Sequence, residues 1–247
     1  MNTKSYIKKF NNEGYFVVPN FLNKVEISKI LNEINKSKDT DVYKDRNNVI
    51  RRIEKIYDKG EYLKEINNRF IKLIKNSLNL NVLIFKDKFN LKPPGGEGFY
   101  AHYDGIFYFT NSRNEKKRGW YEYGDLFISI LIAIDDCDEE NGTIEIAKSH
   151  ENNFENLIKK TKNDGTPNLL EKIEKKTLFN KINLNSGDLV LFKNTCPHRS
   201  SKNKSKKDRR ILYYTYLSED FGNQYNNYFE DKKLSKNKSS KSLRGEK

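Results

Sequence analysis

The chain has three histidines, His102, His150 and His198, so few combinations of metal ligands are possible. His102 is separated from Asp104 by one residue. Residues i and i+2 of a strand face the same side, so both would point into one cavity if Phe99–Asp104 is extended. With His198 they would supply two imidazoles and one carboxylate to one face of an octahedral ion. This ligand set is typical of non-haem iron(II) oxygenases.

Two further residues near His198 could bind an organic acid. Ser200 lies two positions after His198 and shares its side if the backbone is extended. Arg209 begins a predicted strand that could lie beside it, and a guanidinium offers a planar fork to a carboxylate. Arg210 is adjacent, and a shift of one residue in strand register would exchange the two arginines. The sequence leaves open which of them faces the site.

The other candidate residues have both functional and structural interpretations. His150 lies in a turn or helix-start segment, which favours packing or capping over metal binding. Cys196 is expected to be a small buried residue, because a thiolate beside iron would be prone to oxidation. Tyr103 and Trp120 are candidate substrate contacts, although aromatic residues of this kind also pack ordinary strands.

Composition indicates a folded chain in spite of its high charge. Of its 247 residues, 35% are hydrophobic, 13% are aromatic and 33% are charged. Disordered chains are poor in aromatics. The formal net charge is +13, but Lys and Asn are abundant in every segment, which indicates compositional bias rather than a nucleic-acid-binding patch. We expect no nucleic-acid partner and a small molecule as substrate, and the net charge is compatible with an anionic one.

Cysteine content and hydropathy indicate in which cellular compartment the protein is expected. Two cysteines, Cys137 and Cys196, make no disulfide framework and no CxxC zinc motif. The N-terminus has no apolar segment typical of a secretory signal, and no apolar run approaches the ~20 residues of a membrane span. We expect a soluble cytoplasmic protein. The oligomeric state cannot be read from these features.

Hydrophobic periodicity predicts helices first and strands afterwards. Helical stripes occur over residues 25–34 and 62–78, with Asn23 as an N-cap, and residues 36–49 are polar and predicted to form a loop. Strands are predicted at residues 15–18, 82–91, 99–104, 126–135, 143–147, 181–184, 188–193 and 210–217. Many short strands after helices predict a sandwich or barrel with a helical flank.

One domain, residues 1–231, is expected to contain all of these elements. The last residues, 232–247, are rich in Lys and Ser and predicted to form a disordered basic tail. The polar loop Asn111–Gly119 lies between two predicted strands and could act as a lid.

Six segments in order make the chain resemble the phytanoyl-CoA dioxygenase family of iron(II)- and 2-oxoglutarate-dependent oxygenases. The resemblance covers about residues 8–220. The segments are Gly14-Tyr15-Phe16-Val17-Val18-Pro19, Lys92-Pro93-Pro94-Gly95-Gly96, His102-x-Asp104, Asn141-Gly142 leading to Ser149-His150, Ser186–Phe192, and His198-x-Ser200 with Asn203-x-Ser205 and Arg209.

The resemblance implies a mainly β (α+β) fold, a double-stranded β-helix or jelly roll of the cupin type, flanked by N-terminal helices. It implies Fe(II) on the three ligands, 2-oxoglutarate as cosubstrate, and O2. The distal carboxylate of 2-oxoglutarate is then expected on Arg209 and Ser200, with Lys88 and Leu131 also facing the cosubstrate. Leu131 replaces an aromatic residue of the family. Arg199 replaces the usual glycine after the second histidine and could reach the cavity rim.

The implied reaction is hydroxylation, or another oxidation such as desaturation, of an aliphatic C–H, with release of succinate and CO2. In halogenating relatives a small residue replaces the carboxylate ligand, so Asp104 predicts oxidation without halogen transfer. Two alternatives remain: a metal-dependent non-oxidative enzyme on a cupin-like barrel, and a non-catalytic basic binding protein on the same scaffold.

Overall fold

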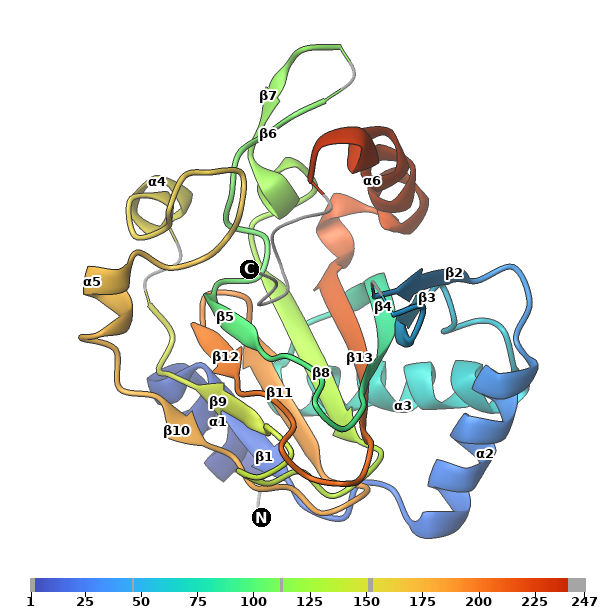
Figure 1. Ribbon diagram of the computed structural model, residues 1–247. Coiled ribbons are helices and arrows are strands. Elements are labelled where there is room, and N and C mark those ends of the chain that lie inside the picture. The colour runs from blue at the N-terminus through green and yellow to red at the C-terminus, as the bar shows by residue number, and fades with distance from the viewer. Residues whose placement is uncertain (1–2, 46, 112, 151–152, 240–247) are drawn as a thin grey trace.

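Two antiparallel sheets facing one another form the core of the computed structural model, which describes residues 3–45, 47–111, 113–150 and 153–239 (Figure 1). The seven-stranded sheet has the order β1-β11-β8-β13-β4-β3-β2 and the four-stranded sheet has the order β10-β9-β12-β5. The arrangement confirms the predicted jelly roll with N-terminal helices.

The large sheet contains β1 (Tyr15–Val18), β2 (Asp41–Lys44), β3 (Ile50–Glu54), β4 (Val82–Lys92), β8 (Phe127–Ala133), β11 (Leu189–Lys193) and β13 (Arg209–Ser218). The small sheet contains β5 (Phe99–His102), β9 (Ile144–Ile146), β10 (Asn180–Lys181) and β12 (His198–Ser200). Separate from both, β6 (Phe109–Thr110) and β7 (Lys116–Lys117) form a hairpin. The short helices are η1 (Gly119–Glu122), α4 (Phe154–Ile158), α5 (Glu171–Glu174) and η2 (Glu219–Phe221).

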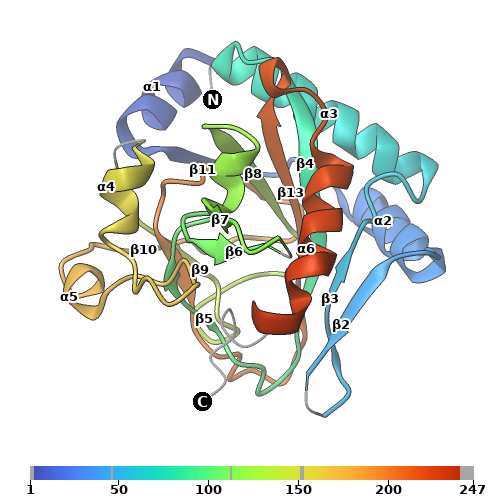
Figure 2. The same ribbon diagram turned by 90° about the horizontal axis from the view of Figure 1, so that it is seen from above.

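Helices α1 (Thr3–Glu13), α2 (Lys24–Lys36) and α3 (Glu61–Leu78) lie along the outside of the large sheet (Figures 1 and 2). Asn23 caps α2 as predicted: its side chain accepts from Glu26 N, and the Glu26 carboxylate accepts from Asn23 N. The apolar stripes of α2 and α3 join the outer face of the sheet in the largest hydrophobic cluster.

Strand β8, which lies between β11 and β13, is buried along its whole length. Its outward residues, Ile128, Ile130 and Ile132, pack in the cluster beneath the helices. Its inward residues, Ser129, Leu131 and Ala133, face the space between the sheets. A strand covered on both faces has no need of polar alternation, which explains the continuous apolar run in the sequence.

Two predictions about the polar segments were wrong. Residues 36–49, predicted as a loop, contain β2, which pairs with β3 in a hairpin at the sheet edge. The predicted disordered tail was to begin at residue 232, but helix α6 runs from Tyr225 to Ser239. Lys232 forms an ion pair with Glu54, which is 1% exposed, so tertiary contacts order a segment that its composition alone would leave unfolded. Residues 240–247 lie outside the described residues.

Within the described ranges, none of the helices is both long enough and apolar enough to span a membrane.

Candidate metal centre and cosubstrate cavity

The small sheet brings together the three predicted metal ligands. His102 on β5 and His198 on β12 are direct partners across the two strands, and their ring centroids are 4.2 Å apart. Asp104 follows β5 by two residues, and its Oδ2 lies 4.0 Å from His198 Nε2. One ligand atom from each residue lies within 4.8 Å of those of the other two. Residues 96 positions apart in the chain thus meet because β5 and β12 are neighbouring strands.

Backbone carbonyls fix the orientation of both imidazoles. His102 Nδ1 lies 2.7 Å from the carbonyl oxygen of Tyr100, and His198 Nδ1 lies 3.1 Å from that of Cys196. A carbonyl can only accept, so each Nδ1 carries the proton and each Nε2 keeps a free lone pair. Metal-binding histidines are oriented in this way by a second hydrogen bond.

The protonation states suit a cation. Burial, followed by the neighbouring His198, lowers the pKa of His102 to about 3. Burial alone would raise the pKa of Asp104, but His198, Lys88 and the other nearby bases outweigh it and hold the pKa below its usual range. Neutral imidazoles and an ionised carboxylate are the forms that bind metal. The donor set therefore fits an iron(II) ion, with its remaining positions open to the cavity.

A tight turn directs the chain away after Asp104. Gly105 has φ +78°, and a Cβ there would lie 2.4 Å from the indole of Trp120. Asn194 O accepts from Asp104 N at 3.2 Å, which holds the end of the strand. The close packing of Trp120 on Gly105 keeps the carboxylate of Asp104 beside the histidines.

The ligands line a cavity of about 590 Å³ between the two sheets. Trp120 lines it, and its contact with a substrate stays a prediction. Tyr103 does not line it: it is fully buried on the other side of β5, and its hydroxyl hydrogen-bonds His150 Nδ1. Strand alternation explains this, because His102 and Asp104 face the cavity and the residue between them must face away. The prediction that Tyr103 contacts substrate was therefore wrong.

Leu131 also fails to reach the cavity. It is fully buried in a cluster with Val190, Phe192 and Ile211, beneath the lining residues. Leucine is shorter than the aromatic residue expected at this position. The side chain of Leu131 is therefore not among the residues that line the cavity, where the cosubstrate contact was expected.

The structure separates Arg209 from Arg210. Arg209 is 3% exposed and lines the cavity, and its Nε has no hydrogen-bond partner within the described chain. Arg210 faces the other way, and its Nε and Nη2 donate to the Asp135 carboxylate at 2.8 and 2.7 Å. A buried guanidinium facing a cavity with an unpaired donor is suited to an anion. The strand β13 that carries Arg209 lies in the large sheet and faces β12 across the interior, not beside it as predicted.

Ser200 and Lys88 line the same cavity. Lys88 Nζ lies 4.5 Å from the centre of the Tyr213 ring. Burial, followed by the charge of Lys86, lowers the pKa of Lys88 to about 7. Both side chains are placed where a cosubstrate carboxylate could meet them. Arg199 lies at the rim, with its guanidinium engaged by Glu145 and Glu174 at 2.9 Å each.

Lys92 is a residue that sequence reasoning treated only as a strand end. Its Nζ donates to Ser200 Oγ at 2.9 Å and to the carbonyls of Gly142 and Ser201 at 3.0 and 2.6 Å. Burial, followed by Arg209, lowers its pKa to about 6. Lys92 therefore positions Ser200. The alternation of Lys86, Lys88, Asn90 and Lys92 along one strand was the signal that could have revealed it.

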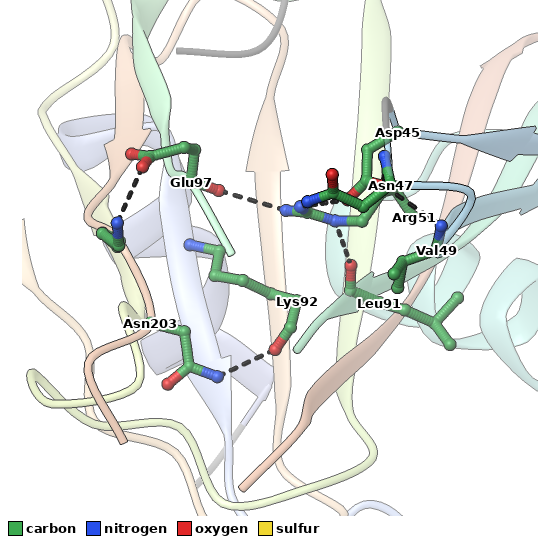
Figure 3. Close-up of polar contacts among 9 residues, drawn as sticks. Asp45, Asn47, Val49, Arg51, Leu91, Lys92, Glu97 and Asn203 are labelled. Atoms are coloured by element: carbon green, nitrogen blue, oxygen red, sulfur yellow. Dashed lines mark hydrogen bonds and ion pairs between the residues drawn. The ribbon is translucent and has the colours of Figure 1, made fainter. Parts of the chain in front are cut away.

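Two side chains, Asn203 and Arg51, hold the end of β4 and the loop that follows it (Figure 3). Asn203 Nδ2 donates to Lys92 O at 2.8 Å, while Gly95 N donates to Asn203 O. Arg51 donates to the carbonyls of Leu91 and Glu97 at 3.1 and 3.4 Å. The Asn203 motif thus has a structural role.

Two segments predicted to have other roles lie around the site. His150 lies outside the cavity lining, where its bond to Tyr103 is consistent with a packing role. The predicted lid is the β6–β7 hairpin region, which contributes Phe109, Thr110 and Asn114 to the lining. Residue 112 lies outside the described residues.

Two curated relatives are named as oxygenases of small phosphonates. The chain is 30% identical over 162 residues to the 2-aminoethylphosphonate dioxygenase of uncultured bacterium HF130_AEPn_1, covering 65% of this chain and 55% of that protein. It is 28% identical over 155 residues to the methylphosphonate hydroxylase of Gimesia maris, covering 62% of this chain and 52% of that protein. The chain spans about half the length of these curated relatives.

Solved structures share the fold at low identity. The epimerase SnoN, in complex with Fe3+, alpha ketoglutarate and nogalamycin RO, superposes with a TM-score of 0.66 at 13% identity, over 87% of this chain and 83% of that one. EctD from S. alaskensis, with 2-oxoglutarate and 5-hydroxyectoine, gives 0.66 at 16% identity, over 88% and 76%.

The sequence profile described as phytanoyl-CoA dioxygenase (PhyH) matches residues 10–211, which include the three ligands, the cavity strands and Arg209. The match extends over most of the described jelly roll. The chain belongs to the phytanoyl-CoA dioxygenase (PhyH) family.

Proposed function

We propose that the protein is an iron(II)- and 2-oxoglutarate-dependent dioxygenase that oxidises an aliphatic C–H of a small molecule. The observation that carries the proposal is that His102, Asp104 and His198 share one cavity with the buried guanidinium of Arg209, whose Nε has no hydrogen-bond partner among the described residues. A metal site alone would also suit a hydrolase. The buried arginine adds the feature that an oxo acid requires.

The residues have distinct roles in this reaction. The bound iron would activate O2, with 2-oxoglutarate converted to succinate and CO2 as the substrate is hydroxylated or desaturated. His102, Asp104 and His198 hold the ion. Arg209, with Ser200 and Lys88 along the same cavity, would hold the far carboxylate of 2-oxoglutarate and orient it. Trp120 and its neighbours would exclude water from the reacting C–H.

The substrate would be a small anionic molecule. The two relatives named above act on phosphonates, according to their names. The cavity of about 590 Å³ is of the size that holds a cosubstrate with a small ligand.

The test is succinate release by purified protein, which we expect to require both Fe(II) and 2-oxoglutarate. His102→Ala should lower turnover by at least 100-fold, because an ion held by two ligands is bound weakly and misplaced. His150→Ala removes the same chemical group outside the cavity and should retain iron and turnover.

Other outcomes would favour the alternatives. Turnover without any requirement for 2-oxoglutarate would point to a non-oxidative metal enzyme. Unchanged biological activity in His102→Ala would point to a binding protein. The Asp104 carboxylate predicts no halogenated product in chloride, and mass spectrometry of the product checks this directly.

A further inference from the structure

The inner face of β4 carries an unusual row of cationic side chains. Lys86, Lys88, Asn90 and Lys92 alternate along it, and Lys86, Lys88 and Asn90 line the cavity. Lys86 is only 8% exposed. A lysine in such a place ordinarily has a carboxylate partner, because burying an unpaired charge is costly.

The cations of the cavity differ in their partners. Arg199 is engaged by two glutamates, and Arg52 and Lys232 share the carboxylate of Glu54. Lys86 forms no ion pair within the described chain. Its Nζ lies 4.6 Å from the centre of the Trp120 ring and 5.5 Å from that of Tyr228. The Trp120 ring contacts the ammonium and the Tyr228 hydroxyl accepts a hydrogen bond from it, but neither side chain neutralises its charge.

Strand register separates Lys86 from Arg209. Arg209 is paired with Lys92 across β13 and β4, whereas Lys86 is paired with Thr215. Six residues along a strand span about 20 Å. Ser129, which is paired with Thr215 on the other side, has its hydroxyl 3.5 Å from Asp104 Oδ2. A cosubstrate held between the metal ligands and Arg209 would therefore leave the Lys86 end of the cavity to the substrate.

Three basic side chains gather at this end of the cavity, although burial lowers the pKa of Lys232 to about 7. Lys86, Arg52 and Lys232 line the cavity, with Glu54 as the carboxylate between the last two. Burial works against the charged form of Lys86, but Tyr228, Asp104 and Glu54 outweigh it and raise its pKa above the usual range. The carboxylate of Asp231, from α6, accepts from the Tyr123 hydroxyl at 2.6 Å.

We propose that Lys86, with Arg52 and Lys232 beside it, is a subsite that binds the acidic head group of the substrate, a phosphonate. The inference rests on the proposed function and names the substrate class of the same cavity. A phosphonate presents three oxygens and up to two negative charges, so it can accept from the Lys86 ammonium and still offer oxygens to the donors of Arg52 and Lys232 that Glu54 leaves unused. With its head group held there, the adjacent carbon would face the metal ligands.

The first test is binding of methylphosphonate to the full chain loaded with Fe(II) and 2-oxoglutarate without O2, measured by calorimetry. Lys86→Met should weaken binding roughly 10- to 100-fold, the range expected for a lost charge-assisted hydrogen bond. Binding of 2-oxoglutarate should change by less than about threefold. Lys206→Met removes an equal charge from an exposed position and should change neither affinity.

A second comparison separates phosphonate recognition from general attraction of anions. We expect 2-aminoethylphosphonate to bind more tightly than the sulfonate and carboxylate of the same carbon skeleton, and Lys86→Met to reduce this difference. Lys86→Gln keeps a polar group and gives a second variant if the first unfolds, as judged by thermal unfolding. Equal binding of all three head groups, or unchanged methylphosphonate affinity in a folded variant, would overturn the subsite.

The experiments distinguish a failure of the phosphonate subsite from a failure of the proposed dioxygenase activity. Methylphosphonate binding that depends on Lys86, without any succinate release, would support the subsite and contradict the dioxygenase. Succinate release coupled to a neutral substrate, with a KM unaffected by Lys86→Met, would support the dioxygenase and contradict the subsite.

Discussion

Arg209 and Arg210 are neighbours in the chain, but their surroundings are opposite. Arg209 is buried against the cavity with an unpaired Nε, and burial lowers its pKa from the usual value. Arg210 is paired with Asp135 at the surface side of β13. At the scale of single residues, the proposed cosubstrate site therefore depends on one buried guanidinium whose Nε has no partner in the part of the chain that the structure describes.

Arg209→Met should raise the KM for 2-oxoglutarate roughly 10- to 100-fold, because the carboxylate loses a charged two-point donor. Arg209→Lys should not restore it fully, since an ammonium cannot reproduce the fork. Steady-state kinetics of succinate release measure this effect.

Arg210→Met is the matched control. It should leave that KM unchanged and lower the free energy of unfolding by about 1 kcal/mol or less, as for other partly exposed ion pairs. Equal effects of the two substitutions on KM would contradict the assignment.

At the scale of elements, β4 organises both sides of the large sheet. Its inner face carries the cavity lysines. On its outer face, Asp87 is fully buried, accepts from the backbone N–H groups of Ile56 and Tyr57, and accepts from the Tyr225 hydroxyl at 2.6 Å. The Asp87 carboxylate thus connects β4 to the loop between β3 and α3, and to the first turn of α6.

This carboxylate predicts a pH dependence of stability. Burial raises the pKa of Asp87 to about 6 against an ordinary value of 3.8. Between these values the folded protein binds more protons than the unfolded one, so stability falls as pH rises through this window. Asp87→Asn keeps the shape without the ionisation. Its free energy of unfolding relative to the wild type should therefore rise by up to about 3 kcal/mol between pH 4 and pH 7.

Denaturant unfolding of both proteins at several pH values measures this difference. A difference that stays constant with pH would show that Asp87 is not the titrating group.

At the scale of the whole molecule, the C-terminal helix completes a cavity built mainly by the two sheets. Tyr228, Asp231 and Lys232 of α6 line it, and α6 crosses beside the β2–β3 hairpin (Figure 2). Phe229 anchors the helix: it is 2% exposed, it belongs to the largest hydrophobic cluster, and Lys55 Nζ lies 5.1 Å from the centre of its ring. The protein's last described element therefore contributes to a site whose metal ligands lie far earlier in the chain.

Phe229→Ala should lower the free energy of unfolding by about 3 kcal/mol, the cost of removing a buried aromatic ring. Leu234→Ala, at a position 61% exposed, should change it by less than about 0.5 kcal/mol. Denaturant unfolding gives both values, and hydrogen exchange should show faster exchange in α6 of the first variant. A similar stability of the two variants would mean that α6 is not anchored through Phe229.

From local signals the sequence predicted a sandwich or barrel with a helical flank, and an HxD pair whose side chains share a strand face as candidate metal ligands. The resemblance to the phytanoyl-CoA dioxygenase family, carried by six segments in order, narrowed the fold to a jelly roll. The same alternation, applied strictly, would also have excluded Tyr103 from the cavity.

Only the tertiary structure decided which arginine faces the cavity, that Leu131 lies beneath its lining, and that residues 232–239 are helical. Each of these depends on strand register or on partners distant in sequence, such as Glu54 for Lys232. The sequence also could not show that Arg209 is paired with Lys92, six residues from Lys86 on the same inner face of β4. Strand pairing and the cavity depend on segments that are distant in the chain.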